Sequence, residues 1–549
     1  MSPRLKSPAP RDAGGPNRRG VLAGTLAAVP LAIPLPGAAA AATGEAGAAF
    51  GFADAVAEAR TLAEAPYRPA DQTLTAPFEA LDYDRYRAIR FRREADPLAG
   101  HGAFGLDLLP PGSVFRTPVE ILLVEDGAPR PIPFDAGVFD FDPRYFALEG
   151  GRAPEGAGAG LAWSGFRLRY PMSRPETLDE FAVFQGASYF RAVGRDMVYG
   201  LAARGLALAT ADPAGEEFPA FRRFWIHRPA PSAAEITVHA LLDSPSCAGA
   251  FEFRIRPGDT TVMDTRCRLF PRREIATAGL APLNSMFFFG PGSRAGIDDW
   301  RDAVHDSEGL QMVTGMGQRL WRPLANPPTV QVSAFVDAGP RGFGLAQRRR
   351  RFADYQDAEA RYDRRPSAWV EPLAEPDSAG DGGAGDGSAG HGGAWAEGAV
   401  LLVEIPVDSP FNDNIVAFWR PAAPLAPRDA GHALAYRIHW CDRPPDRAAL
   451  ARVSASRSGS AVTARGRRRM VVDFDLDRDR AGMAAVTPRL ETTAASAGPV
   501  TLIDLPEGTG CRAAFGIDPA EAGQLEFRLT LDGPDGPLSE TWLSRWSAP

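Results

Sequence analysis

Asp413 is the first residue whose setting could serve chemistry. It lies between Asn412 and Asn414 in the segment DSPFNDN, which joins two apolar runs, VLLVEIPV and NIVAFW. The runs are rich in Val, Ile, Leu and aromatic residues and predict buried strands, so the polar segment is predicted to connect them. Such a connection can carry a functional group. The alternative is that all three are turn residues, whose short polar side chains bond to their own backbone.

A second polar segment, VHDSEGL, contains His305 and Asp306. Taken alone, it is explained by Asp306 capping a turn and by His305 as a structural histidine. The chain has no H-E-x-x-H pattern, no G-x-S-x-G and no P-loop. Its four cysteines, Cys247, Cys267, Cys441 and Cys511, have no C-x-x-C spacing. We therefore expect neither a metal ion nor a cofactor. Cys247 and Cys267 flank a predicted hairpin and could pair or remain thiols.

The overall charge limits the partners. The formal net charge is −8, and nucleic acids or anionic membranes need clustered positive charge. We therefore expect no nucleic-acid partner and favour a neutral ligand.

The first 42 residues predict an export signal. Arg18 and Arg19 precede a moderately apolar stretch and an alanine run with A-x-A cleavage sites, the pattern of a twin-arginine leader. The apolar run is broken by Pro30, Pro34 and Gly37 and is short for a membrane span. We expect export to the periplasm by the twin-arginine route, with no membrane insertion after cleavage.

Most of the remaining chain predicts strands. FADAVAEARTLAEA, at 52–65, has helical periodicity, whereas FEFRIRPGDTTVMDTRCRLF alternates apolar and polar residues on both sides of a turn at 257–259. Similar strands follow one another between Gly- and Pro-rich turns. The predicted fold class is all-β and sandwich-like.

Two composition changes suggest the domain organisation. RPAAPLAPRDAGHA contains three prolines and separates a domain at 43–420 from about 120 residues of short strands at 427–549, the size of an immunoglobulin-like sandwich. The run at 377–398 is low in complexity and rich in Gly, Ala and Asp. It is predicted to be a loop inserted in the first domain, because the strand pattern resumes after it.

Long segments of the chain resemble the periplasmic glucan biosynthesis proteins G and D. The resemblance is carried by FEALDYDRYRAIRFR, SYFRAV, FPAFRRFWIHRP, the block from NSMFFFGPG to WRPLANP, PRGFGLAQRRRRFADYQDAEARYDRRPSAWVEP, VEIPVDSPFNDNIVAFW and LSETWLSRW. It implies a large antiparallel β-sandwich similar to galactose mutarotase, followed by an immunoglobulin-like domain. The twin-arginine leader favours the D-type member.

The resemblance also implies an activity. Members of this family resemble glycoside hydrolases that cleave β-1,2-glucan with inversion, and some relatives transfer the chain to form cyclic products. Inversion needs one carboxylic acid at the leaving oxygen and one carboxylate that activates water. Asp413 matches the general acid and Asp306 the general base, which acts in this family through a relay of water and hydroxyl groups. Tyr362 matches a tyrosine near that relay.

Further residues in the same segments are candidates for substrate binding. Aromatic rings could stack on pyranose faces or simply fill the core, and their crowding in these segments favours a sugar-binding cleft. The arginines could donate to sugar hydroxyls or pair with acids, and we expect Glu404 to be a strand residue with a partner. The candidates are Trp300, His305, Trp321, Arg322, Arg341, Phe343, Trp369, Asn412 and Asn414.

Two functional classes remain open. In the first, the chain hydrolyses or transglycosylates β-1,2-linked glucan with Asp413 and Asp306. In the second, it is a non-catalytic protein that binds the nascent glucan or docks onto the membrane glucan synthase. The presence of both acidic segments favours the enzyme.

Overall fold

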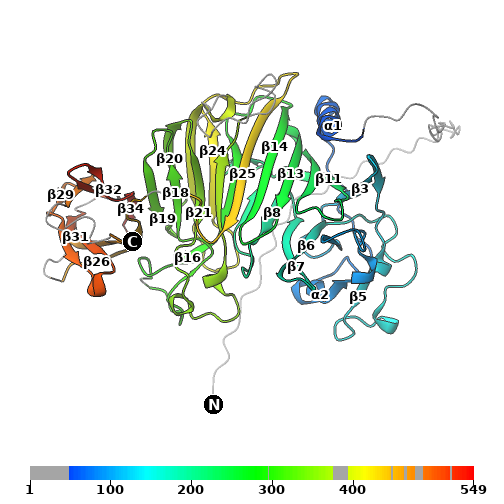
Figure 1. Cartoon of the computed structure of the whole chain (residues 1–549), viewed down its shortest axis with the longest axis horizontal. Coiled ribbons are helices and arrows are strands. Elements are labelled where there is room, and N and C mark those ends of the chain that lie inside the picture. The colour runs from blue at the N-terminus through cyan, green and yellow to red at the C-terminus, as the bar shows by residue number, and fades with distance from the viewer. Residues whose placement is uncertain are drawn as a thin grey trace, which may run out of the picture. The chain divides into compact units, whose positions relative to one another are not determined.

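A computed structural model describes residues 49–548, apart from 295, 375–392, 447–448, 463–465, 477–485 and 520–521. The predicted leader therefore lies outside the described residues. Within them, no helix combines the length and apolar character that a membrane crossing requires. The chain is nearly all β, as predicted, with α1 (Phe52–Glu64) at the predicted helix and a short α2 (Tyr83–Arg87). Ala55 and Ala59 of α1 pack on Trp225, Leu241 and Phe270. Figure 1 shows α1 beside the strands β13 (Cys247–Arg256) and β14 (Thr261–Pro271) of the large sheet.

The largest sheet has fifteen strands among the described residues. Most neighbours are antiparallel, but β3 pairs with β11, and β34 with β19, in parallel. In sheet order the strands are β28 (Thr487–Thr492), β32 (Gln524–Gly533), β34 (Thr541–Ser547), β19 (Arg319–Pro323), β18 (Gly309–Val313), β21 (Gly342–Ala346), β22 (Ser367–Pro372), β25 (His432–Cys441), β14 (Thr261–Pro271), β13 (Cys247–Arg256), β12 (Ile236–Asp243), β11 (Ala220–His227), β3 (Glu120–Glu125) and β4 (Ala128–Pro131), with β33 (Gly536–Pro537) beside β32.

A second, ten-stranded sheet shares the main hydrophobic core with the first. Phe184, Phe190 and Leu402 of this sheet pack in one cluster with Phe251 and Phe253 of the larger sheet. Its strands, in order, are β2 (Gly105–Leu109), β6 (Gly165–Arg174), β7 (Thr177–Gln185), β8 (Tyr189–Ala192), β9 (Ala202–Arg204), β15 (Ala278–Ser285), β24 (Ile415–Pro421), β23 (Glu397–Glu404) and β20 (Gln331–Ala338), with β10 (Ala207–Leu208) beside β15. The two sheets form the predicted β-sandwich. Its likeness to galactose mutarotase stays a prediction.

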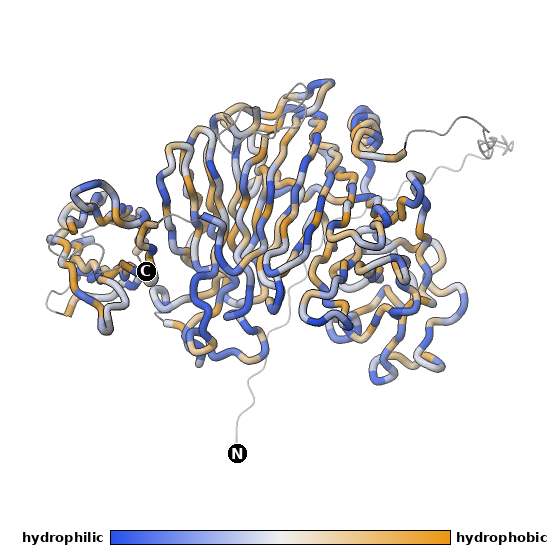
Figure 2. Tube along the Cα trace, in the orientation of Figure 1, coloured by the Kyte–Doolittle hydropathy of each residue, from blue (hydrophilic) through white to orange (hydrophobic). Residues whose placement is uncertain are grey.

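The alternation expected from the sequence is visible along the strands. In β14, residues from Thr261 to Leu269 are alternately buried and half-buried, and hydropathy alternates along many strands in Figure 2. The predicted hairpin is present, because β13 and β14 pair antiparallel. Its register places Cys247 opposite Pro271 and Cys267 opposite Phe251. The two cysteines are thus several residues out of register, too far apart for a disulfide.

The C-terminal strands build a second, smaller β-sandwich. A sheet with five strands among the described residues packs on β32 and β34 through Val472, Phe515 and Phe527. Its strands are β26 (Val453–Ser460), β27 (Arg468–Phe474), β31 (Cys511–Asp518) and β29 (Ser496–Ala497), with β30 (Thr501–Asp504) beside β31. In the part of the chain that the structure describes, two further two-stranded ribbons are formed by β1 (Ile89–Phe91) with β5 (Phe139–Phe141), and by β16 (Phe287–Phe289) with β17 (Val304–His305). An immunoglobulin-like topology stays a prediction.

The structure corrects two predicted boundaries. The segment placed at the start of the C-terminal domain contains β25, which lies between β14 and β22 inside the large sheet. The C-terminal sandwich therefore begins after Cys441. The prediction was wrong because the prolines mark a turn between two strands of the large sandwich and not a boundary between domains. The end of the predicted low-complexity loop is also ordered. There the buried Trp395 packs at a tilt against Trp419 and donates from Nε1 to the Ala435 carbonyl at 3.0 Å. Residues 375–392 of that loop lie outside the described residues.

Candidate functional site

Asp413 lies on the loop that connects β23 to β24, as the sequence predicts. The loop spans residues 405–414, and Asn414 closes it, since its amide donates to the Ile405 carbonyl at 2.9 Å. The same side chain reaches the neighbouring ribbon. It accepts a hydrogen bond from the Phe287 backbone N–H at 2.8 Å and donates to the Phe287 carbonyl at 3.0 Å. Asn414 is therefore a buried positioning residue and is not available to a sugar, contrary to the sequence interpretation.

The ribbon β16–β17 brings Asp306 to the same region. Phe287 pairs with His305, and Asp306 follows directly, with its backbone N–H donating to the Met286 carbonyl at 2.8 Å. Beyond Asp306, the hydroxyl of Ser307 forms a hydrogen bond of 2.8 Å with the hydroxyl of Ser285, at the end of β15. Two acids 107 positions apart in the sequence are thus held at neighbouring points of one backbone network.

Asp306 is a buried carboxylate with one cationic partner. Its residue is only 4% exposed, and burial raises the pKa of its carboxyl to about 6. The Arg365 guanidinium contacts the carboxylate and opposes this rise, whereas the negative charge of Asp413 adds to it. The two acids are therefore close enough for their charges to interact. A carboxyl with this pKa is a stronger base than an ordinary one and is still ionised near neutral pH.

Asp413 is half-buried and faces a cation from the ten-stranded sheet. Arg191 donates from Nη2 to its Oδ2 at 3.4 Å. Arg191 and Tyr189 alternate along β8 with the buried Phe190 and Ala192, so both point away from the core. The charge of Asp413 also reaches Tyr189, whose hydroxyl pKa is raised mainly by burial. This face of β8 therefore forms one wall of the site.

Tyr362 lies beside Asp306, as the resemblance implies. It begins the short 3-10 helix Tyr362–Arg364 and is buried. The Arg365 guanidinium lies 4.5 Å from the centre of its ring. Burial raises the pKa of the Tyr362 hydroxyl, and the negative charge of Asp306 adds to the effect. The hydroxyl therefore stays protonated near neutral pH, as a group that passes a proton must be able to do.

Three predicted substrate-binding residues lie at a different place. His305, Trp321 and Arg322 line a cavity of about 200 Å³ that neither acid lines. His305 and Asp306 are adjacent in an extended segment, so their side chains point to opposite sides. Arg322 donates to Glu404 at 3.1 Å, and both residues are buried. This confirms the expected partner for Glu404 and leaves Arg322 committed to an ion pair.

Phe343, Trp369 and Arg341 also lie away from the acids. Phe343 is fully buried in the main core. The buried Trp369 packs its ring against Gly342, where a Cβ would come within 2.4 Å of it. Arg341 is exposed and precedes β21, whereas the far end of that strand, Ala346, bonds to Glu308 near the acids. These three residues therefore have structural or surface positions. The sequence could not show this, because the spacing of residues in a segment does not reveal which end of a strand lies near the acids.

The remaining candidates are on the surface. Trp300 is 68% exposed, with the Arg301 guanidinium 5.8 Å from its ring centre. Asn412 is exposed on the same loop as Asp413, and Phe411 beside it is 91% exposed. Exposed rings of this kind can stack on sugars.

Sequence reasoning did not single out Arg191, Arg365 or Tyr189. All three lie in segments that carry the family resemblance, SYFRAV and YDRRPSAW. Their contacts with Asp413 and Asp306 join residues far apart in the chain, 222 positions for Arg191 and Asp413. The only available signal was their presence in those segments.

Comparisons with known proteins agree with the resemblance. Residues 50–546 match the family described as periplasmic glucan biosynthesis protein, MdoG. The "Glucans biosynthesis protein G" of Vibrio cholerae is 42% identical over 492 residues, which are 89% of this chain and 85% of that protein. The protein of that name from Rhodopseudomonas palustris is 41% identical over 535 residues, 97% of this chain and 100% of the relative. The one from Shewanella baltica is 41% identical over 505 residues, 91% and 88% of the two chains.

These relatives carry the name of protein G, whereas the leader favoured the D-type member, so the D-type assignment stays a prediction. The match covers both β-sandwiches and the segments that hold Asp306 and Asp413. The family match extends over nearly the whole chain, and full-length relatives share about two fifths of its residues. The chain therefore belongs to the MdoG family of periplasmic glucan biosynthesis proteins.

Proposed function

We propose that this chain is a periplasmic enzyme of glucan biosynthesis that acts on the β-1,2-linked glucan backbone. Asp413 donates a proton to the glycosidic oxygen as the bond from that oxygen to the anomeric carbon breaks. Asp306 accepts, through Tyr362 and water, the proton of the water that attacks the anomeric carbon from the opposite face. If a sugar hydroxyl takes the place of water, the same steps give transglycosylation and a cyclic or elongated chain.

The observation that carries the proposal is the coupling of the two acids. Asp306 and Asp413 come from different segments, yet the charge of Asp413 contributes to the raised pKa of Asp306. Inverting hydrolysis needs one carboxylate that accepts a proton and one carboxyl group that donates one at the same site. Asp306, with its raised pKa, is suited to accept the proton, and the family resemblance makes Asp413 the donor.

The burial of Asp306 supports a relayed base. A carboxylate that is only 4% exposed and held by Arg365 has little room for a water aligned on the sugar. The negative charge of Asp306 raises the pKa of the Tyr362 hydroxyl. This hydroxyl offers a route by which the proton can reach the Asp306 carboxylate. This arrangement agrees with the relay that the family resemblance implies.

Arg191 supports the acid role of Asp413. When Asp413 gives up its proton it becomes a carboxylate, and the Arg191 guanidinium at 3.4 Å stabilises the new negative charge. The proton transfer is therefore favoured as the sugar leaves. The substrate linkage rests on the family resemblance, and the periplasmic location rests on the family description and on the twin-arginine leader.

The test uses the mature chain and purified linear β-1,2-glucan. We expect release of reducing ends, or a cyclic product that is lighter than the linear chain of equal length by one water, resolved by mass spectrometry. The Asp413→Asn chain should bind the glucan and release neither product. Binding without any product from the wild-type chain, across the pH range, would leave only the glucan-binding or synthase-docking function.

A further inference from the structure

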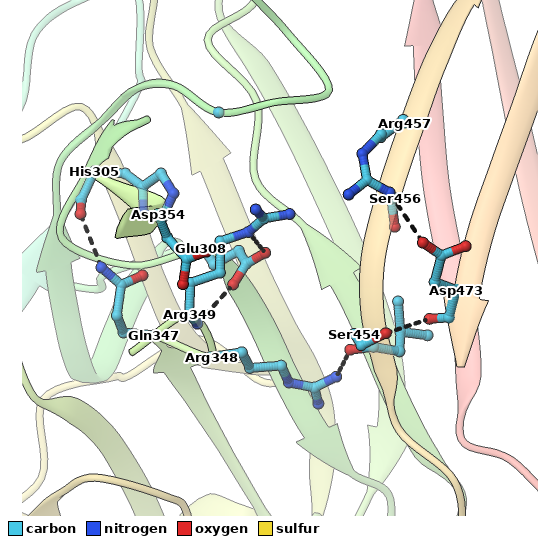
Figure 3. Close-up of polar contacts among 12 residues, drawn as sticks. His305, Glu308, Gln347, Arg348, Arg349, Asp354, Ser454, Ser456, Arg457 and Asp473 are labelled. Carbon is cyan, nitrogen blue, oxygen red and sulfur yellow. Dashed lines mark hydrogen bonds and ion pairs between the residues drawn. The ribbon is translucent and has the colours of Figure 1, made fainter. Parts of the chain in front are cut away.

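A cavity of about 200 Å³ lies where the large sandwich meets the C-terminal sandwich. One wall comes from β16, β17 and β19 and includes Phe287, His305 and Trp321. The other comes from β26 and β34 and includes Ser456 and Trp546. Figure 3 shows His305, Glu308 and Arg349 on segments of the large sandwich, and Ser454, Ser456 and Arg457 on β26 to their right. The volume far exceeds the ~15 Å³ that one water requires.

His305 closes the inner end of the cavity as an uncharged, fully buried residue. Its ring stacks on Phe287 and meets the edge of the Tyr355 ring. Burial lowers the pKa of the imidazole to about 4, so the ring is neutral and adds no charge to this wall.

The charges of the cavity exclude an ionic ligand. Each arginine that lines it is already paired with an acid: Arg322 with Glu404, Arg349 with Glu308, Arg457 with Asp473 and Arg545 with Glu526. An anion would have to compete with these pairs, and a cation would find no unpaired carboxylate among the described lining residues. The cavity is therefore suited to a neutral ligand.

The remaining lining residues have the chemistry of a sugar site. Five serines line it, namely Ser454, Ser456, Ser458, Ser544 and Ser547. The Ser454 hydroxyl donates to the Asp473 carbonyl, and those of Ser456 and Ser547 accept from Trp542 and Gln331. Each of these hydroxyls keeps capacity for a further hydrogen bond. The rings of Phe287, Trp542 and Trp546 supply apolar walls. Hydroxyl groups beside aromatic rings match a pyranose, which has polar edges and apolar C–H faces.

We propose that this cavity is a second carbohydrate site, which binds one glucosyl unit of the glucan outside the catalytic site. The inference rests on the proposed function for the identity of the sugar. Its position gives it a physical role, since the cavity and the acids lie on opposite sides of the ribbon β16–β17. Phe287 and His305 line the cavity, while Asn414 and Asp306 occupy the other side of the same ribbon. A bound sugar would anchor the glucan next to the acid pair.

The experiment fills the cavity without touching the acids. Ser458 on β26 makes no side-chain hydrogen bond within the described part of the chain, so Ser458→Phe should occupy the space while the fold remains. Ser460→Phe is the matched control, since Ser460 lies two residues along the same strand, is exposed and does not line the cavity. Ser544→Phe fills it from β34. Circular dichroism melts check the fold of each variant.

Each change is placed in the full mature Asp413→Asn chain, and the β-1,2-linked glucose disaccharide is titrated by calorimetry and tryptophan fluorescence. We expect two disaccharides to bind per parent chain and per Ser460→Phe chain, but one to either filled chain, with affinity at the lost site reduced more than tenfold. Inorganic phosphate should not bind at the cavity. Glucose alone should compete with the disaccharide there if a single unit is recognised.

Equal binding by the parent and by both folded filled chains would overturn the proposal, as would phosphate binding that the filling removes. Failure of the proposed function gives a different result. If the wild-type chain releases no product from the glucan while Ser458→Phe still loses one bound disaccharide, the cavity is a sugar site and the catalytic assignment is wrong.

Discussion

Asp306 and Asp413 have different surroundings, and the difference bears on their roles. Asp306 is buried, with a pKa near 6, and Asp413 is half-buried beside Arg191. The raised pKa suits Asp306 to accept a proton, and the family resemblance makes Asp413 the proton donor. The roles are separated by experiments in which protonation of the leaving group is needed or not needed.

Asp413→Asn should lower turnover of β-1,2-glucan by about 10²- to 10⁴-fold, the usual contribution of general acid catalysis. The amide keeps the volume and the contact with Arg191 but cannot deliver a proton. Reducing-sugar release measures the change, and a glucan oligosaccharide with an aryl leaving group supplies the control. Because an aryl oxide leaves without a proton, Asp413→Asn should keep most activity on it, whereas Asp306→Asn should lose activity on both substrates. The reverse pattern would exchange the two roles.

The pH dependence follows from the pKa of Asp306. A base must be ionised, so kcat/KM should fall tenfold per pH unit below about pH 6. Arg365 lowers this pKa, and Arg365→Gln should therefore move the acidic limb to higher pH. A limb that stays unmoved in Arg365→Gln would contradict the assignment of Asp306.

The raised pKa of Asp306 also affects the stability of the fold. Its effect on the free energy of unfolding changes with pH in the opposite direction to that of an ordinary paired acid, whose pKa is lowered by folding. The contribution of Asp306 is complete below its unfolded value of 3.8 and is lost as pH rises through about 6.

At the scale of elements, the loop of β23 and β24 is joined to the ribbon β16–β17 by one amide. Asn414→Ala removes three hydrogen bonds, to Phe287 and Ile405, and leaves buried backbone groups without partners. We expect a loss of unfolding free energy on the order of 2 kcal/mol and lower turnover, because Asp413 loses its support. Asn412→Ala, two residues earlier and exposed, should change stability by less than about 0.5 kcal/mol. Urea denaturation compares the two variants, and equal losses would show that the amide does not position the loop.

The low-complexity segment offers a second prediction at this scale. Deletion of residues 378–390 should leave the melting temperature nearly unchanged, because loop-closure entropy depends weakly on length and a Gly/Ala segment contributes little core. The cut must stop before Trp395, which packs on Trp419 and Tyr436. Trp395→Ala should destabilise the protein by about 3–5 kcal/mol. A large loss in the deletion would show that the segment contributes to the fold.

At the scale of the whole described chain, the two sandwiches share strand pairing and a buried ion pair. β34 pairs with β19, and Glu540 accepts hydrogen bonds from Arg348 at 3.0 Å and from the Val453 backbone at 2.7 Å. The Arg348 guanidinium also lies 3.5 Å from the centre of the Trp321 ring. The joint is therefore packed and largely buried, which favours unfolding of both sandwiches together.

Glu540→Gln tests the joint. It leaves the buried Arg348 without its counter-charge, and breaking such a pair typically costs about 3–5 kcal/mol. Glu526→Gln breaks the more exposed pair with Arg545 and should cost at most about 1 kcal/mol. Thermal and urea unfolding measure both. A small loss in Glu540→Gln would mean that the pair is not needed at the joint.

Local patterns in the sequence determined the strand content, the helix at 52–65, the hairpin that turns at 257–259 and the position of Asp413 on a connection. These features depend on residues close together in the chain, where alternation and turn residues act directly. The family segments added the pairing of Asp306 with Asp413. The structure places the two carboxyl groups close enough for their charges to interact, and their catalytic roles stay predictions.

Only the tertiary structure decided what faces what. His305 and Asp306 are neighbours in the sequence, yet one lines the cavity and the other meets Arg365. Phe343 lies in the core, and β25 lies inside the large sheet, where composition suggested a domain boundary. Periodicity shows which residues share a face of a strand, but the group that covers that face comes from a distant segment. The contacts of Arg191 with Asp413 and of Asn414 with Phe287 are therefore fixed by sheet order and register, which the local sequence does not contain.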